Sequence, residues 1–145
     1  MTTPTAREVV TSLVHAVVNS TDTVADFYAP ELTIEMPFGA PLYPASQQTG
    51  REQLRAQIVD GTKSRRYTKV DNVVIHETTD PEVVIVEYEV HGDNLDTETP
   101  FVLPLLMIIT VRDGLIVHSR DYSNAVAGAV ALGRVPELLT ALGEL

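Results

Sequence analysis

Four segments rich in β-branched residues fill the second half of this 145-residue chain and constrain its fold more than any other feature. Turn signals separate these segments, which span residues 67–76, 82–91, 101–111 and 115–122. The turns at 79–81 (TDP) and 112–114 (RDG) are short enough to join neighbouring strands as hairpins. This half of the chain therefore predicts an antiparallel sheet.

The first half of the chain begins with helical patterns. Thr5 and Glu8 have the spacing of a capping box, and apolar residues recur at helical spacing from there to about Asn19. A second short helix is expected over residues 23–29, because the ring of Pro30 cannot continue a helix. These segments predict a pair of N-terminal helices.

A short strand, a third helix and a helical C-terminal region complete the expected layout. Residues 32–36 alternate as a strand does, and residues 50–60 are expected to form a helix with Leu54 and Ile58 inward. The order of elements predicts one α+β domain over the whole chain, with helices on one face of a curved antiparallel sheet.

The two central strands are unusually apolar. Residues 82–91 and 101–111 are apolar, or nearly so, on both faces, whereas the helices can cover only one face of the sheet. A second copy of the chain is the simplest cover for the other face. We therefore expect a homodimer that forms through the open face of the sheet.

The composition argues against several classes of partner. With 20 acidic and 10 basic residues the formal charge is −10, which repels the phosphates of nucleic acids. The chain has no cysteine, so disulfides and thiolate metal sites are excluded. The most apolar stretch, residues 101–111, is about half of a membrane span, and the N-terminus lacks the pattern of a signal peptide. We expect a cytoplasmic protein that binds neither nucleic acid nor membrane.

Several short motifs together resemble one protein family over nearly the whole chain. They are residues 27–37 (FYAPELTIEMP), 50–54 (GREQL) and 112–122 (RDGLIVHSRDY). This combination resembles the SnoaL-like, nuclear transport factor 2-like superfamily. The tail, residues 120–124 (RDYSN) through 131–136 (ALGRVP), is most similar to the PhzA/PhzB branch of phenazine biosynthesis.

The resemblance implies a cone-shaped fold, in which a bent sheet wraps around the N-terminal helix and encloses a cavity. Members include polyketide cyclases, ketosteroid isomerase, limonene epoxide hydrolase and binding proteins without known chemistry, so the fold does not fix the reaction. A hydrophobic small molecule is the expected ligand. No cofactor is expected, and no metal site, because His76, His91 and His118 have no ligand-like spacing.

Asp121 is the leading candidate for a catalytic residue. In the families that the chain resembles, the acid of the Arg-Asp/Glu-Tyr motif points into the cavity, and strand alternation would then turn Val117 and Ser119 inward with it. An apolar cavity raises the pKa of a carboxyl group towards neutrality, which suits general acid/base catalysis. Alternatively, Asp121 pairs with Arg120 or caps the following helix.

Three further residues are candidates for assisting Asp121. The resemblance places Glu87 and Glu89 on a strand face that lines the cavity; alternatively this face is exposed and the residues between them are buried. His15 lies near the apolar stripe of the first helix and could donate a hydrogen bond into the cavity, or it is a core or rim residue.

The loop 37–49 is too apolar for open solvent, and we expect it to form a lid over the mouth of the cavity. Tyrosine hydroxyls could bind a ligand, although tyrosine is also a common core residue. The residues expected to contact the ligand or line the cavity are Tyr28, Phe38, Leu42, Tyr43, Leu54, Ile58, Phe101, Leu103, Leu105, Met107 and Ser119.

The residues that define several known members of the superfamily are missing. Met36 stands where ketosteroid isomerase has its aspartate base, Glu87 where limonene epoxide hydrolase has its arginine, and Gln57 where the phenazine branch has a histidine. Two hypotheses remain. The protein is a cofactor-free isomerase, cyclase or dehydratase acting on a hydrophobic carbonyl compound, or it is a non-catalytic carrier or sensor of a hydrophobic metabolite.

Overall fold

A computed structural model describes residues 2–145. Two helical segments, α1 (Ala6–Asn19) and the 3₁₀ helix η1 (Thr21–Phe27), precede the first strand. The other elements, in chain order, are β1 (Tyr28–Glu35), β2 (Ser46–Gly50), α2 (Arg51–Gly61), β3 (Arg65–Glu77), β4 (Val83–Asn94), β5 (Thr99–Arg112), β6 (Leu115–Ser123), α3 (Ala125–Ala131) and α4 (Val135–Gly143).

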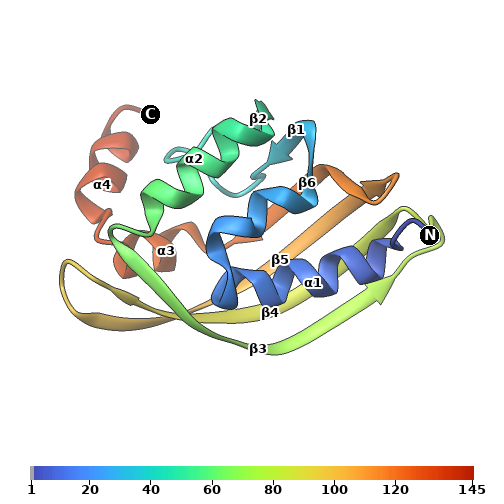
Figure 1. The fold of residues 1–145 in the computed structure, drawn as a ribbon. Coiled ribbons are helices and arrows are strands. Elements are labelled where there is room, and N and C mark those ends of the chain that lie inside the picture. The colour runs from blue at the N-terminus through green and yellow to red at the C-terminus, as the bar shows by residue number, and fades with distance from the viewer. Residues whose placement is uncertain (1) are drawn as a thin grey trace.

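All six strands form one curved sheet in the order β2-β1-β6-β5-β4-β3, with α1 lying across its inner face (Figure 1). The predicted α+β fold is confirmed. The sheet is not wholly antiparallel, however, because β1 runs parallel to β6. These two strands are far apart in the sequence, so no hairpin turn fixes their relative direction.

The predicted capping box begins α1. The Thr5 side chain accepts a hydrogen bond from the backbone N–H of Glu8 at 3.2 Å, and the Glu8 carboxylate reaches back to the N–H of Thr5. Val10 and Leu13 of this helix are buried in the core against β3, β4 and β5. The core therefore lies between α1 and the inner face of the sheet.

Alternation decides which strand residues enter this core. The even-numbered residues Val84, Val86, Tyr88 and Val90 of β4 are buried, as are Phe101, Met107, Ile109 and Val111 of β5. In β6, an irregularity opposite residues 110–111 shifts the register, so Ile116 rather than Val117 faces the core. The prediction that Val117 points inward is therefore wrong, whereas Ser119 faces the core and is fully buried.

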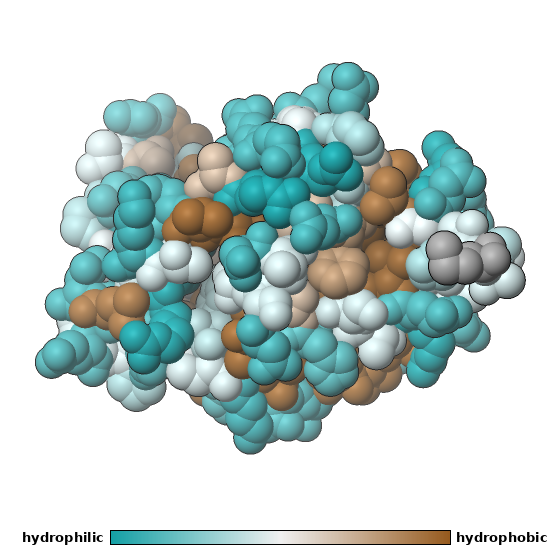
Figure 2. Space-filling view, in the orientation of Figure 1, coloured by the Kyte–Doolittle hydropathy of each residue, from teal (hydrophilic) through white to brown (hydrophobic). Residues whose placement is uncertain are grey.

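Helices α3 and α4 lie at the end of the sheet away from the N-terminus (Figure 1). The Asn94 side chain at the end of β4 donates a hydrogen bond to the carbonyl of Ala131 at 3.1 Å and so ties α3 to the sheet. The face of the molecule that carries α1 and α2 is mostly hydrophilic, with small apolar patches (Figure 2). Over residues 2–145, no helix is both long enough and apolar enough to span a bilayer.

Candidate functional site

A cavity of about 510 Å³ opens between α2, α3, the segment before β2 and the adjacent part of β5. This volume is in the range of small-molecule sites. Much of the wall is apolar, with a few polar side chains among the hydrophobic ones. Residues that form it include Leu54, Ile58, Arg65, Leu103, Leu105 and Ser123.

Asp121 lies directly beyond the wall of this cavity. Leu105 and Ser123 are paired across β5 and β6 and both line the cavity, and the next inward-facing pair along the same strands is Met107 with Asp121. The two pairs are two residues apart, or roughly 7 Å along the strand. Asp121 does not itself line the cavity. It belongs to the next inward-facing residue pair along β5 and β6, beyond the pair that forms the cavity wall.

The surroundings of Asp121 favour its neutral form. Burial raises its pKa to about 6, against a usual value of 3.8, while a hydrogen bond from the Ser119 hydroxyl to Oδ1 and the charge of His118 act in the opposite direction. Among residues 2–145, no donor is bound to Oδ2. Asp121 is therefore a carboxyl group that changes its protonation near neutral pH and has one oxygen free.

Two tyrosines are close enough to Asp121 to respond to its charge. Burial raises the pKa of Tyr28 and of Tyr88, and the charge of Asp121 raises both further. Both phenols therefore remain protonated, and the Tyr88 hydroxyl lies 4.0 Å from the sulfur of Met107. Tyr88 was not predicted as a site residue from the sequence. Its hydroxyl is nevertheless the one polar side-chain group among the even-numbered positions 84–90, which are otherwise apolar.

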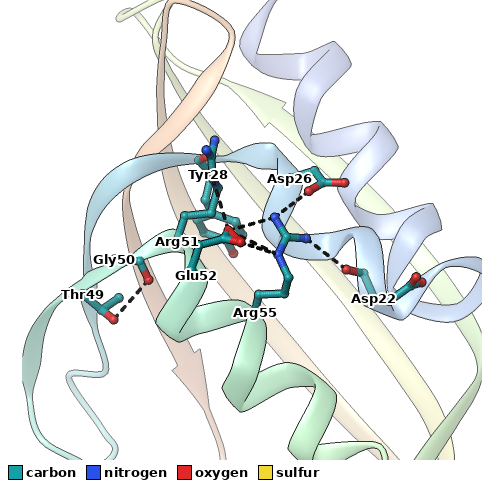
Figure 3. Close-up of polar contacts among 8 residues, drawn as sticks. All are labelled: Asp22, Asp26, Tyr28, Thr49, Gly50, Arg51, Glu52 and Arg55. Carbon is teal, nitrogen blue, oxygen red and sulfur yellow. Dashed lines mark hydrogen bonds and ion pairs between the residues drawn. The ribbon is translucent and has the colours of Figure 1, made fainter.

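A network of polar contacts fixes the start of α2 beside β1 and η1 (Figure 3). Arg51 donates a hydrogen bond to the carbonyl of Tyr28 at 3.4 Å. Arg55 forms ion pairs with Asp26 at 2.7 Å and Glu52 at 3.1 Å. These contacts join α2 to the elements around Tyr28 and thereby position the helix whose residues line the cavity.

The loop 37–49 contributes to the cavity only in part. Tyr43, Pro44 and Gln47 line it, and the Tyr43 hydroxyl accepts a hydrogen bond from Arg134 at 2.8 Å. Phe38 is 65% exposed and packs edge-on against Tyr122 on the outer face of the sheet, with ring centroids 5.2 Å apart. Phe38 therefore does not line this cavity, contrary to the expectation from the sequence. Leu42 is half-buried and does not line the cavity.

The other expected ligand contacts fall into two groups. Leu54, Ile58, Leu103 and Leu105 line the cavity. Tyr28, Met107 and Ser119 lie deeper, in the core around Asp121, and Phe101 packs against Tyr67 with ring centroids 6.3 Å apart.

Glu87 and Glu89 do not join Asp121. Glu87 forms an ion pair with His76 at 2.7 Å, and Glu89 accepts a hydrogen bond from Asn72 at 2.9 Å, both on the outer face of the sheet. The cause is the alternation of β4, whose even-numbered apolar residues pack under α1 and turn the glutamates outward. The alternative of an outer acidic face was the correct one.

His15 is also separate from the cavity. It is exposed on α1, on the opposite side from the buried residues Val10, Leu13 and Val14. Its expected role as a hydrogen-bond donor into the cavity is therefore wrong. No group of three or more histidine or carboxylate side chains within residues 2–145 could hold a metal ion.

Comparison with known proteins places the fold among characterised architectures. A solved structure of a proposed isomerase from Bacillus subtilis is 22% identical, covers 89% of this chain and 93% of its own, and has a TM-score of 0.79. A proposed polyketide cyclase from Pseudomonas putida KT2440 is 17% identical, covers 89% of this chain and 98% of its own, and has a TM-score of 0.74. These likenesses show the fold.

The sequence comparisons identify the family. An uncharacterised PhzA/B-like protein from Pseudomonas aeruginosa is 31% identical over 114 residues, which are 76% of this chain and 77% of that protein. The SnoaL-like domain matches residues 10–119. The resemblance to this superfamily near the PhzA/PhzB branch is thus confirmed, and the chain belongs to the SnoaL-like domain family.

Proposed function

We propose that this protein binds a hydrophobic carbonyl compound in the 510 Å³ cavity, that the compound reaches past the pair Leu105 and Ser123 to the carboxyl group of Asp121, and that Asp121 transfers a proton on it without a cofactor. The reaction is then an isomerisation, cyclisation or dehydration. The observation that carries the proposal is an inward-facing carboxyl group with a pKa near 6 behind a cavity of suitable size. A proposed polyketide cyclase among the structural neighbours is consistent with this reaction class.

The proposed chemistry begins with the ionised form of Asp121. Its free Oδ2 takes a proton from the carbon next to the substrate carbonyl, so that a C–H bond breaks, an O–H bond forms and the electron pair moves to the carbonyl oxygen. A neutral phenol, Tyr28 or Tyr88, donates a hydrogen bond to the resulting enolate oxygen. When the substrate has a carbon–carbon double bond next to that carbon, the enolate is conjugated with it, and return of the proton to the far end of the double bond gives the isomer.

Exchange of carbon-bound hydrogen for deuterium tests this proposal without knowledge of the substrate. A panel of alicyclic and aromatic ketones is incubated with the protein in D₂O and followed by NMR. We expect exchange that rises with pH through about 6, because the base must be ionised, and that falls at least ~100-fold in Asp121→Asn. Asp113→Asn, on the β5–β6 turn, removes one charge elsewhere and is the matched control.

The position of Asp121 beyond the cavity wall favours a second candidate, a carrier or sensor of a hydrophobic metabolite. The same panel separates the two candidates. A ketone that shifts the NMR signals of cavity residues, yet exchanges no faster than in buffer in the wild type, would support the carrier and exclude catalysis on that compound.

A further inference from the structure

Arg65, the first residue of β3, lines the same cavity as Leu54 and Leu103. Its Nε donates a hydrogen bond to the Tyr67 hydroxyl at 3.0 Å, and its guanidinium lies 5.9 Å from the centroid of that ring. Within residues 2–145, no carboxylate forms an ion pair with it. In a chain with two acids for every base, a cavity thus contains a half-buried guanidinium without an acidic partner.

The end of α2 is shaped to receive this guanidinium. A Cβ atom at Gly61 would lie 2.6 Å from Nη2 and 3.0 Å from Cζ of Arg65. The absence of a side chain at Gly61 therefore allows the guanidinium to lie against the helix end. Gly61 positions Arg65, and its effect can be tested separately from the charge.

A second polar group of the cavity is available to a ligand. The Tyr43 hydroxyl accepts a hydrogen bond from Arg134, whose guanidinium lies 5.1 Å from the ring centroid. A hydroxyl that accepts in this way keeps its own proton for another acceptor. The cavity therefore offers hydrogen-bond donors, from Arg65 and Tyr43, within a largely apolar wall.

We infer that the ligand of this cavity carries a carboxylate group and that Arg65 binds it. The inference rests on the proposed function and names the substrate class. A guanidinium matches a carboxylate with two parallel N–H···O bonds, and the apolar wall around it strengthens this charge-assisted contact. The remainder of the ligand is hydrophobic and packs against the leucine and isoleucine side chains.

Binding of two isosteric probes tests the inference. 2-Naphthoate and 2-naphthamide share one apolar body and differ in a carboxylate against a neutral amide; their affinities are measured by calorimetry, and the site by NMR. We expect the wild type to bind the naphthoate at least tenfold more tightly, and Arg65→Met to abolish that preference while retaining the naphthamide. Arg66→Met is the matched control, because Arg66 lines only the neighbouring cavity of about 400 Å³, whereas Arg65 lies at the boundary of both cavities.

Two further variants separate charge from geometry. Arg65→Lys keeps the charge without the two-pronged geometry, and Gly61→Ala keeps the arginine but displaces its guanidinium. Both are expected to reduce the preference for naphthoate at least threefold and to leave the affinity for naphthamide unchanged. Circular dichroism confirms that each variant folds.

The outcomes distinguish this inference from the proposed function. Equal affinity of the wild type for the two probes, or a preference that survives Arg65→Met, would overturn the role of Arg65 and leave the cavity proposal intact. Failure of both probes to bind at millimolar concentration would overturn both proposals.

Discussion

At the residue scale, Asp121 carries an unfavourable charge in the folded protein at neutral pH. Its pKa is raised from 3.8 to about 6, so the native state binds the proton more tightly than the unfolded chain. The folded state is therefore penalised progressively as the pH rises from about 4 through 6, and the full penalty applies above that range. The shift corresponds to a free energy of at most about 3 kcal/mol.

Replacing this carboxyl group by a neutral amide should stabilise the protein. We expect Asp121→Asn to be more stable than the wild type by about 2 kcal/mol at pH 8, with a difference that shrinks through pH 6 and disappears below pH 4. Urea unfolding at a series of pH values measures this difference, with Asp113→Asn as the control. A stability difference between the variant and the wild type that does not change with pH would contradict this prediction. It would mean that Asp121 has the same pKa in the folded and the unfolded protein.

The alternation of side chains along a strand predicted which residues point towards the core only where a second observation identified the face that meets the helix. Asp121 was placed inward because a family motif gave its orientation. Glu87 and Glu89 alternate just as regularly, but a strand pattern defines two faces without stating which one meets the helix. His15 is adjacent to buried residues in the sequence yet points away from them, because its helix buries one stripe only.

At the element scale, the loop between β1 and β2 divides its aromatic residues between two faces. Tyr43 lines the cavity, whereas Phe38 packs on Tyr122 outside it. No sequence period assigns side chains to faces in an irregular loop, so the prediction that the loop forms a lid over the cavity could not separate Tyr43 from Phe38. By contrast, the capped helix and the hairpin strands follow from local patterns and were predicted close to their bounds.

The division of the loop leads to a prediction for two matched truncations. Tyr43→Ala removes a ring from the cavity wall and should weaken the binding of 2-naphthamide about tenfold, or about 1.4 kcal/mol. Phe38→Ala removes a ring from the outer face and should leave that affinity unchanged. Calorimetric titration of both variants measures the effect. An equal loss in the two variants would mean that the whole loop closes over the ligand.

At the scale of the whole molecule, the sheet has one face covered by helices and one open. On the open face, Val102 is 49% exposed, and Ile85 and Ile108 are paired across β4 and β5. The ion pair between Glu87 and His76 borders these apolar residues on the β3 side. The curved sheet with a covered inner face could be predicted from the sequence, whereas the size of the cavity depends on side chains from several elements and could not.

We propose that a second copy of the chain covers the open face, so that the protein is a homodimer in solution. Ile108→Glu places a charge at the centre of this face and should convert the dimer to a monomer, because an unpaired buried charge is strongly unfavourable in an interface. Leu139→Glu is the matched control, since Leu139 is 63% exposed on α4. Sedimentation velocity measures the mass of each variant. A dimer that dissociates with Leu139→Glu but persists with Ile108→Glu would place the interface on the C-terminal helices instead.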